Sequence, residues 1–191
     1  MFCISGPSGT GKGTIREAFE RKHPDLEFCV SVTTRLPRPN EEPGVSYIFV
    51  GVDEFHQMAE RGEFLETANV YGNYYGTPRE PVTRLLEQGV DVLLEKDVQG
   101  ALAIKQKMPE AVLVFIAPPS FDELRARIMK RGTETDNDVE VRLGWAEAEL
   151  KQVRHFDYVV VNYEVAESVR VLDAIVVAER HRTKRLREYI R

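Results

Sequence analysis

The sequence has little of what marks disulfide-stabilised, zinc-binding or membrane-spanning proteins. Its two cysteines, Cys3 and Cys29, are too few for a disulfide framework, and we expect both to be buried thiols. Its four histidines show no spacing typical of zinc ligands, so no zinc site is predicted. No long apolar run and no signal-peptide pattern is present, which predicts a cytoplasmic protein.

An excess of positive charge is also missing. The net charge is −5, so the chain has no general attraction to nucleic acid or membrane surfaces, and neither is an expected partner. Residues 180–191 are strongly basic. We interpret them as the solvated face and C-terminal turn of a last helix, where cations suit the helix dipole, with a nucleic-acid patch as the alternative. The length of 191 residues fits one globular domain.

A glycine-rich segment near the start carries the strongest functional signal. Residues 5–14 read Ser-Gly-Pro-Ser-Gly-Thr-Gly-Lys-Gly-Thr, which places Gly6 and Gly11-Lys12 at the spacing of a P-loop. Such a loop turns backbone N–H groups around an anion, and the next helix points its positive end at the same place. We expect ATP phosphates to bind here, with Lys12 on the β- and γ-phosphates. A structural turn is the alternative. The predicted ATP-binding residues of this loop are Gly6, Pro7, Ser8, Gly9, Thr10, Gly11, Lys12, Gly13 and Thr14.

One position departs from the usual P-loop pattern. A Ser or Thr normally follows the lysine and helps to hold Mg²⁺, but here Gly13 has that place and Thr14 comes one residue later. Two interpretations stay open. The Thr14 hydroxyl contacts phosphate, or the metal is held mainly through water, since Mg²⁺ keeps several of its waters.

Short apolar segments alternate with helix-like ones along the chain, which predicts an α/β fold with a parallel sheet and crossover helices. The run 112–116 is continuously apolar, as a strand buried on both faces requires. Ser120 with Glu123 forms a capping-box pattern, and Gly89 ends a helical pattern at 78–88. Core strands are predicted at 2–5, 90–94, 111–116 and 158–161, with 27–30 as a further candidate.

Two segments interrupt this pattern. Residues 31–84 are rich in Pro, Gly, Tyr and charge, and we predict a small α+β lobe with strands at 45–50 and 64–71 around a helix at 53–61. Residues 128–147 have few apolar anchors, which is typical of a mobile lid. The predicted core then consists of residues 1–30, 85–127 and 148–191.

A second cationic segment lies at residues 31–38, which read Ser-Val-Thr-Thr-Arg-Leu-Pro-Arg. Arg35 and Arg38 are three residues apart on a stretch stiffened by proline. Two guanidinium groups there can bind one phosphate through paired hydrogen bonds. An ordinary solvated loop explains the same residues equally well.

Together with these segments, Tyr47, Glu66 and the run Gly72-Asn73-Tyr74-Tyr75-Gly76-Thr77 resemble guanylate kinases. The resemblance extends to residues 97–101, 117–120, 131–132 and 160–162, and it covers essentially the whole chain in order. It implies a P-loop NTPase-type core sheet flanked by helices, a small lobe that binds the nucleoside monophosphate, and a helical lid. Only five residues precede Gly6, fewer than the family usually has, and we expect this to affect stability more than activity.

The resemblance also implies an activity. The γ-phosphoryl group of ATP would pass to GMP, and to dGMP, as part of purine nucleotide metabolism, with Mg²⁺ as cofactor. Monomer and homodimer both stay open. The residues implied for GMP binding are Ser31, Arg35, Arg38, Tyr47, Glu66, Tyr75, Thr77 and Asp97. The implied catalytic residues are Lys12, Arg35, Arg38, Arg131 and Arg142, and Arg127, Arg131 and Asn162 would bind ATP.

Glu66 has a chemical reason to select guanine. Its carboxylate only accepts hydrogen bonds, and guanine offers N1–H and the 2-amino group as paired donors, whereas adenine has a lone pair at N1. Mismatched polar groups of this kind can discriminate by factors on the order of 10⁴. Taken alone, the spacing of Glu66 favours a polar residue on a strand edge, and Tyr74 and Tyr75 can be ordinary packing residues of the lobe.

Glu95 and Asp97 follow a predicted strand, where a parallel sheet presents its ligands, and they are the expected carboxylates for the water shell of Mg²⁺. The family commonly has Asp-x-Asp with an apolar middle residue, but this chain has Lys96 there. A buried ammonium is costly unless it is paired. We therefore expect Lys96 either to reach the surface or to pair with an acid.

Two other functions fit parts of the sequence. Guanylate-kinase-like interaction modules bind partner proteins, but they typically lose the P-loop that this chain retains. A P-loop kinase for another phosphate acceptor would not need Glu66 together with Thr77. Failure to bind ATP would favour the first alternative, and equal activity on AMP and GMP would favour the second.

Overall fold

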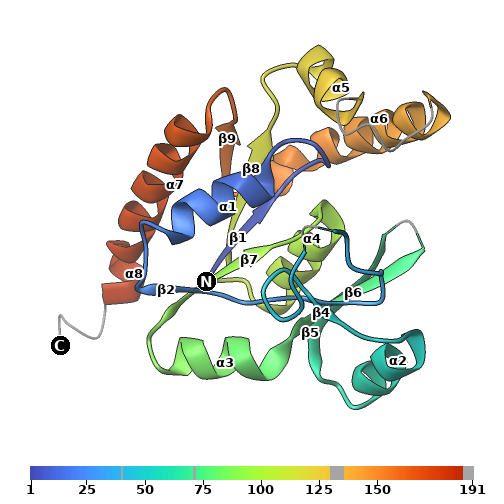
Figure 1. Ribbon diagram of the computed structural model, residues 1–191. Coiled ribbons are helices and arrows are strands. Elements are labelled where there is room, and N and C mark those ends of the chain that lie inside the picture. The colour runs from blue at the N-terminus through green and yellow to red at the C-terminus, as the bar shows by residue number, and fades with distance from the viewer. Residues whose placement is uncertain (40, 71, 130–135, 187–191) are drawn as a thin grey trace. The chain divides into compact units, whose positions relative to one another are not determined.

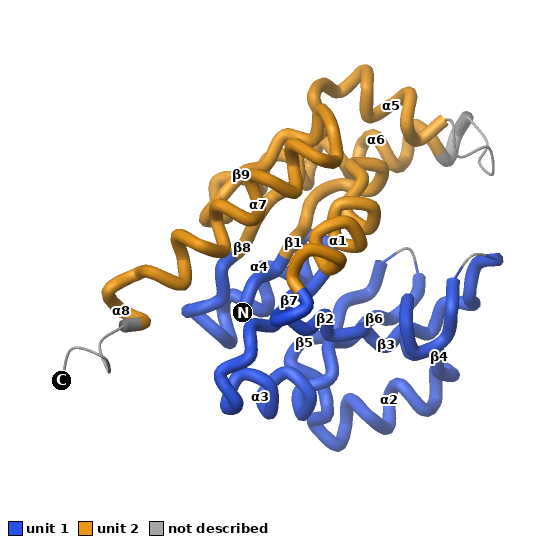
Figure 2. The backbone as a smooth tube through the Cα atoms, turned by 60° about the vertical axis from the view of Figure 1, so that its left-hand side comes forward, with its two compact units in different colours: residues 1–3, 24–112 blue, residues 4–23, 113–191 orange. Residues whose placement is uncertain are grey.

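The computed structural model describes residues 1–39, 41–70, 72–129 and 136–186 (Figure 1). Its contacts divide the chain into two compact units, coloured separately in Figure 2. Unit 1 consists of Met1–Cys3 and Pro24–Val112, and unit 2 consists of Ile4–His23 and Leu113–Arg191. Strand β1 (Phe2–Ser5) contributes residues to both units because the boundary follows Cys3.

The main sheet has five strands in the order β2-β7-β1-β8-β9. Its other strands are β2 (Leu26–Phe28), β7 (Asp91–Glu95), β8 (Val112–Ala117) and β9 (Tyr158–Val161). The pairs β2–β7 and β8–β9 are parallel, which confirms the predicted α/β class. In β8 every residue from Val112 to Ile116 is buried, as the continuous apolar run requires.

A second sheet of four strands, in the order β4-β3-β6-β5, lies in unit 1. Helix α2 (Val52–Glu60) packs on it, because Phe55 joins Val32 and Phe64 in one small apolar cluster. Helices α3 (Arg79–Glu87) and α4 (Val98–Lys107) complete the unit. The strands are β3 (Val32–Thr33), β4 (Ile48–Phe49), β5 (Phe64–Val70) and β6 (Asn73–Pro78).

Strand prediction was least successful in this second sheet. The strand expected at 45–50 is shortened to β4, because Glu42 O accepts the N–H groups of Val45 and Ser46 in a preceding turn. Strand β6 was missed, since its Asn, Tyr and Gly residues resemble a turn in sequence. Its antiparallel pairing with β5 supplies the order that local propensity does not.

In unit 2, helix α1 (Lys12–Glu20) follows the glycine-rich loop and lies alongside α7 (Val165–Arg180), as Figure 1 shows. Helices α5 (Phe121–Met129) and α6 (Asp136–Leu150) pack together through Leu124, Ile128, Val139, Leu143 and Ala146. The short helices η1 (Lys151–His155) and α8 (Thr183–Leu186) follow α6 and α7 in the chain.

The N-terminus of α5 carries half of the predicted capping box. Ser120 Oγ accepts the Glu123 N–H at 3.1 Å, which satisfies one of the first donors of the helix. The Glu123 carboxylate, expected to complete the box, accepts a hydrogen bond from Arg127 Nε at 2.9 Å. The same acid thus links successive turns of α5 rather than only capping the helix.

The basic C-terminal stretch was only partly interpreted correctly. Helix α7 ends at Arg180, and the chain then continues into α8. Two of the basic side chains serve a buried acid, because Arg182 and Arg185 lie 3.3 and 3.4 Å from the carboxylate of Glu179, which is 1% exposed. Tyr158 donates to the same carboxylate at 2.7 Å, and this hydrogen bond raises the pKa of Tyr158. Charge pairing therefore places these arginines, not solvation alone.

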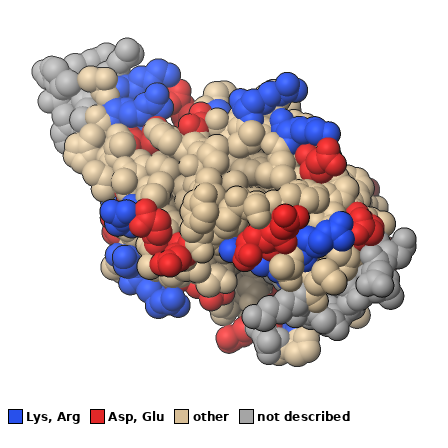
Figure 3. All heavy atoms as spheres, turned by 90° about the horizontal axis from the view of Figure 1, so that it is seen from above, with Lys and Arg blue, Asp and Glu red and all other residues tan. Residues whose placement is uncertain are grey.

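Other expectations about composition can be compared with the fold. Cys3 and Cys29 are both buried free thiols, and burial raises the pKa of each. None of the described helices is long and apolar enough to cross a membrane. On the face shown in Figure 3, basic and acidic side chains are interspersed.

Gly76 on β6 provides a test of packing in the second sheet. A Cβ at this position would lie 2.6 Å from Cδ1 of Phe64, whose ring is held by stacking on Phe55 at 4.7 Å. We expect Gly76→Ala to lower the free energy of unfolding by about 1–3 kcal/mol, as overpacking does. Chemical denaturation measures this. Gly144→Ala adds the same methyl group at an exposed position of α6 where no atom lies within 4 Å, and should not lower stability, because alanine favours a helix interior over glycine. Equal effects of the two substitutions would contradict the packing argument.

Candidate functional site

The glycine-rich loop of unit 2 has the backbone geometry of a phosphate cradle. Gly6 has φ of 136° and Gly11 has φ of 89°, conformations that side chains other than glycine rarely adopt. A Cβ on Gly6 would lie 2.2 Å from the carbonyl oxygen of Ile116 on β8, so the loop passes directly against that strand. Gly11 is also the N-cap of α1, which directs the first N–H groups of the helix at the loop.

Lys12 is the first residue of α1, and its side chain turns back over the loop. Nζ donates to the carbonyl oxygens of Gly6 at 2.6 Å and Pro7 at 3.0 Å. The ammonium group and the helix N-terminus thus bring positive charge to one loop. Gly13 and Thr14 occupy the first turn of α1, where Thr14 is exposed.

A series of buried hydrogen bonds holds the glycine-rich loop in place. Thr10 is fully buried, and its hydroxyl donates to Pro7 O at 2.9 Å. Asn162, which follows β9, donates from Nδ2 to Thr10 O at 2.7 Å and accepts from the Ser168 hydroxyl at 3.0 Å. The Asn162 amide therefore braces the loop in this structure, and its expected contact with adenine stays a prediction.

The predicted lid arginines differ in how far they can be located. Arg127 on α5 lies near the loop brace, since its guanidinium contacts Asn162 O at 3.3 Å. Arg142 on α6 is half-buried. Arg131 lies outside the described residues.

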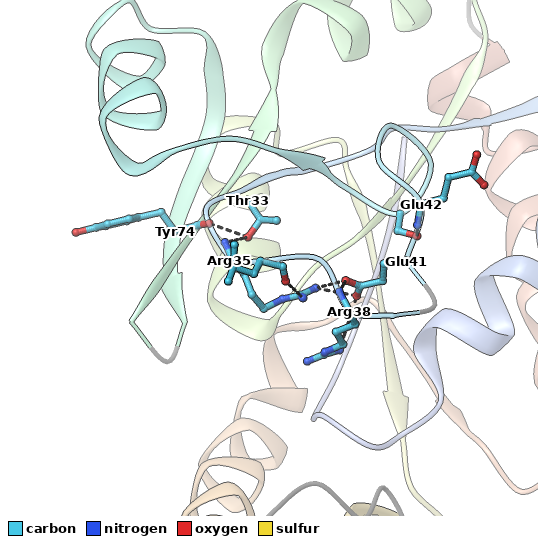
Figure 4. A network of polar contacts seen from close by, with 8 residues as sticks. Thr33, Arg35, Arg38, Glu41, Glu42 and Tyr74 are labelled. Atoms are coloured by element: carbon cyan, nitrogen blue, oxygen red, sulfur yellow. Dashed lines mark hydrogen bonds and ion pairs between the residues drawn. The ribbon is translucent and has the colours of Figure 1, made fainter.

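Arg35 and Arg38, two of the residues predicted to bind GMP, lie in unit 1 and share one carboxylate (Figure 4). Arg35 Nη2 donates to both Glu41 oxygens, at 2.7 and 2.9 Å, and each of these side chains is 16% exposed. The Arg38 backbone N–H donates to the same carboxylate at 2.8 Å, and its guanidinium lies 3.8 Å away. Burial alone would raise the pKa of Glu41, but the hydrogen bonds from Arg35 and Arg38 outweigh it and lower that pKa.

Arg35 lies against Tyr47, and Tyr47 in turn contacts Tyr75. The Arg35 guanidinium carbon lies 5.5 Å from the centroid of the Tyr47 ring, and the Tyr47 ring meets Tyr75 edge-on at 6.0 Å. Burial raises the pKa of Tyr47 to about 12, so its phenol keeps its proton and can donate to an anion. We call Arg35, Arg38, Glu41, Tyr47 and Tyr75 the anion cluster. These side chains suit a phosphate ligand, because guanidinium and phenol groups can donate hydrogen bonds to its anionic oxygens.

Neighbouring tyrosines on β6 have different surroundings because strand side chains alternate. Tyr74 stacks on Phe55 at 5.6 Å and contacts His56 at 4.9 Å, so it packs in the small apolar cluster. Tyr75 faces Tyr47 in the anion cluster. The packing interpretation is therefore correct for Tyr74, while the expected role of Tyr75 at a GMP site stays a prediction.

Buried polar residues of unit 1 form a second group, the reader cluster of Ser31, Glu66, Thr77 and Lys96. The Thr77 hydroxyl on β6 donates to Glu66 Oε1 on β5 at 2.5 Å, and Glu66 is 3% exposed. Lys96 Nζ donates to the Ser31 hydroxyl at 2.5 Å and lies 3.4 Å from Glu66 Oε1. Of the two outcomes expected for Lys96, the structure thus has the second: it pairs with an acid.

The turn after β7 borders the reader cluster. Asp97 is the N-cap of α4, and its Oδ1 accepts the Gly100 N–H at 2.7 Å. A Cβ on Gly100 would lie 2.8 Å from that oxygen and 3.2 Å from Glu66 Oε2, so only glycine fits without displacement. Among the described residues, no group of three or more His, Cys, Asp or Glu is arranged to hold a metal ion.

Sequence analysis did not single out Glu41, although its position three residues after Arg38 was a usable signal. Pairing of Lys96 with an acid was expected, but its partners were not identified, because they come from residues 31 and 66 and no local pattern connects them.

Comparison with known proteins gives a consistent result. The family model described as guanylate kinase matches residues 1–179. The guanylate kinase of Caldanaerobacter subterraneus subsp. tengcongensis is 49% identical over 185 residues, which are 97% of this chain and 90% of that protein. The guanylate kinase of Clostridium perfringens strain SM101 is 47% identical over 188 residues, 98% of this chain and 87% of that protein.

A solved structure extends the likeness to three dimensions. The crystal structure of guanylate kinase from Anaplasma phagocytophilum superposes with a TM-score of 0.82 at 35% identity, covering 98% of this chain and 91% of that one. With a phosphate cradle in unit 2, and with a buried acid and an anion cluster both in unit 1, the chain belongs to the guanylate kinase family.

Proposed function

We propose that this protein transfers the γ-phosphoryl group of ATP to the phosphate of GMP, giving ADP and GDP. Membership of the guanylate kinase family supports the reaction. The observation that carries the choice of acceptor is the buried Glu66 carboxylate, held by Thr77 within the same unit as the anion cluster.

The reaction needs charge compensation more than proton transfer. The attacking oxygen of GMP is already anionic near neutral pH, so no general base is required. The transition state is loose, and the main task is to offset the charge of two polyanions. We assign Lys12 to the ATP phosphates and Arg35 and Arg38 to the GMP phosphate. Arg131 and Arg142 are assigned to the transferring group by family resemblance.

Guanine recognition is assigned to the reader cluster. The Glu66 carboxylate can accept hydrogen bonds from N1–H and the 2-amino group of guanine, two donors that adenine does not offer in that arrangement. If adenine were bound, the Glu66 carboxylate would face the lone pair of adenine N1. Because Glu66 is buried, that mismatch is costly.

Mg²⁺ is the proposed cofactor, and the residues at the end of β7 and just after it fit it. Glu95 and Asp97 are carboxylates, the oxygen ligands that Mg²⁺ prefers, and they would hold it through its waters. Mg²⁺ that arrives with ATP is bound by substrate phosphates and one or two carboxylates, which needs no protein cage of several acids. The metal would neutralise charge on the β- and γ-phosphates.

Several narrower assignments stay predictions. These are the lobe at 31–84, the lid at 128–147, use of dGMP, a cytoplasmic location, and the choice between monomer and homodimer.

Replacing Glu66 by Gln tests the acceptor assignment. The substitution keeps the shape but puts an N–H₂ group in the place of one acceptor oxygen. We expect kcat/KM for GMP to fall about 10²- to 10³-fold while KM for ATP changes less than about twofold. A coupled ADP-release assay with GMP, AMP, CMP and UMP measures this. Glu60→Gln, on the exposed end of α2, is the control and should match the native protein. Equal native activity on AMP and GMP would refute guanine selection.

Glu41 tests how the anion cluster is organised. Glu41→Gln removes the charge that fixes Arg35 against Tyr47 and weakens its bond to the Arg38 backbone. Because hydrogen bonds to charged groups contribute about 1.5–3 kcal/mol, we expect KM for GMP to rise about tenfold, with KM for ATP unchanged. The neighbouring, exposed Glu42→Gln is the matched control. A lower KM for GMP would mean that Glu41 competes with the substrate phosphate rather than positioning its ligands.

A further inference from the structure

The buried ammonium of Lys96 has been given no role of its own so far, yet it contacts two other residues of the reader cluster, Ser31 and Glu66. Its side chain is 6% exposed, and it lies between the Ser31 hydroxyl and the Glu66 carboxylate. Burying a cation is costly unless it is paired and hydrogen-bonded, and both conditions are met here.

We propose that Lys96 is a positioning residue for purine recognition, which fixes the Ser31 hydroxyl as a hydrogen-bond donor and so selects a purine with a 6-oxo group. This inference rests on the proposed GMP site. Lys96 does not contact the base in the proposal; it acts through Ser31, and Glu66 anchors its ammonium group.

The direction of the hydrogen bond carries the argument. A lysine ammonium has three donors and no acceptor, so at 2.5 Å Ser31 Oγ must accept from Lys96 Nζ. The single Ser31 hydroxyl proton then points to another partner. A serine hydroxyl without such a neighbour rotates freely between donating and accepting, and would accommodate either kind of ligand atom.

Glu66 anchors the Lys96 ammonium group and so keeps the direction of the hydrogen bond from Lys96 to Ser31 fixed. Glu66 Oε1 lies 3.4 Å from Lys96 Nζ, and it also accepts the Thr77 hydroxyl at 2.5 Å. Because the two charged side chains are only 2% and 6% exposed, water does not compete strongly for either of them. The polarity of the cluster is therefore set before a nucleotide binds, with Ser31 as donor and Glu66 as acceptor.

Guanine matches that polarity and adenine opposes it. Guanine has an acceptor oxygen at position 6 beside the N1–H donor, so it complements a donor next to an acceptor. Adenine has an amino donor at position 6 and a lone pair at N1, the reverse arrangement. Lys96 thus turns Ser31 from a tolerant group into one that rejects a 6-amino purine.

The test compares nucleotides that differ at one ring position. The variants are Lys96→Met, Ser31→Ala and their combination, assayed with ATP against GMP, AMP and inosine monophosphate, which keeps the 6-oxo group but lacks the 2-amino group. For Lys96→Met we expect KM to rise about tenfold for both GMP and inosine monophosphate, kcat to change less than about twofold, and the preference for GMP over AMP to fall about tenfold.

The double variant, Lys96→Met with Ser31→Ala, tests whether Lys96 acts through the Ser31 hydroxyl. Since Lys96 acts through that hydroxyl, the double variant should be no more than about twofold worse than Ser31→Ala alone. If the effects of the two single substitutions instead multiply in the double variant, the proposal is overturned. So would a loss for GMP without a loss for inosine monophosphate, because that pattern assigns the effect to the 2-amino group and Glu66.

Controls keep a structural role distinguishable. KM for ATP and the thermal midpoint should stay close to native in Lys96→Met, and Lys107→Met, on the exposed face of α4, should be silent in every assay. If Lys96→Met does not fold, Ser31→Ala with Lys96 intact must still lose preference for GMP over AMP. Absence of GMP turnover in the native protein would reject the proposed function. Native turnover and a Glu66→Gln effect as expected, with a silent Lys96→Met, would reject the Lys96 inference alone.

Discussion

The pairing of short buried parallel strands is the constraint on which the functional loops depend. Central strands of such a sheet have neighbours on both sides, and their side chains can be apolar on both faces, as in β8. Polar residues of the proposed sites gather at or after the strand ends. In unit 1, β7 ends at Glu95 and leads into Asp97 at the start of α4. In unit 2, β9 ends before Asn162, which braces the glycine-rich loop.

Among the residues that the structure describes, the buried and half-buried charges of three groups are each paired with an opposite charge or a hydrogen-bond donor. Glu66 lies beside Lys96, Arg35 is bound by Glu41, and Glu179 receives Tyr158, Arg182 and Arg185. The Glu179 group joins α7 to the residues that follow it, and no binding or catalytic role is assigned to it. The first two belong to clusters whose proposed ligands are polar or anionic. The same electrostatic rule therefore serves stability in one place and ligand binding in the other two.

In the proposed site, selectivity of the reader cluster would follow from hydrogen-bond direction more than from shape. The three groups Thr77, Glu66 and Lys96 have few alternative arrangements, because a carboxylate only accepts and an ammonium only donates. A site of this kind needs no large change in geometry to distinguish two purines of similar size. It needs only that its polar groups cannot reorient, which burial and mutual hydrogen bonding provide.

The sequence by itself determined the features whose signals are local. The P-loop spacing, the apolar run of β8, the helix start at Ser120 and the whole-chain resemblance to guanylate kinases can all be read along the chain. The tertiary structure alone decided the features made by distant residues. Strand β6 exists because β5 pairs with it, Asn162 supports the loop 152 residues away, and Lys96 meets Ser31 across 65 residues. These contacts depend on burial and on the direction of hydrogen bonds, and neither is encoded in the spacing of neighbouring residues.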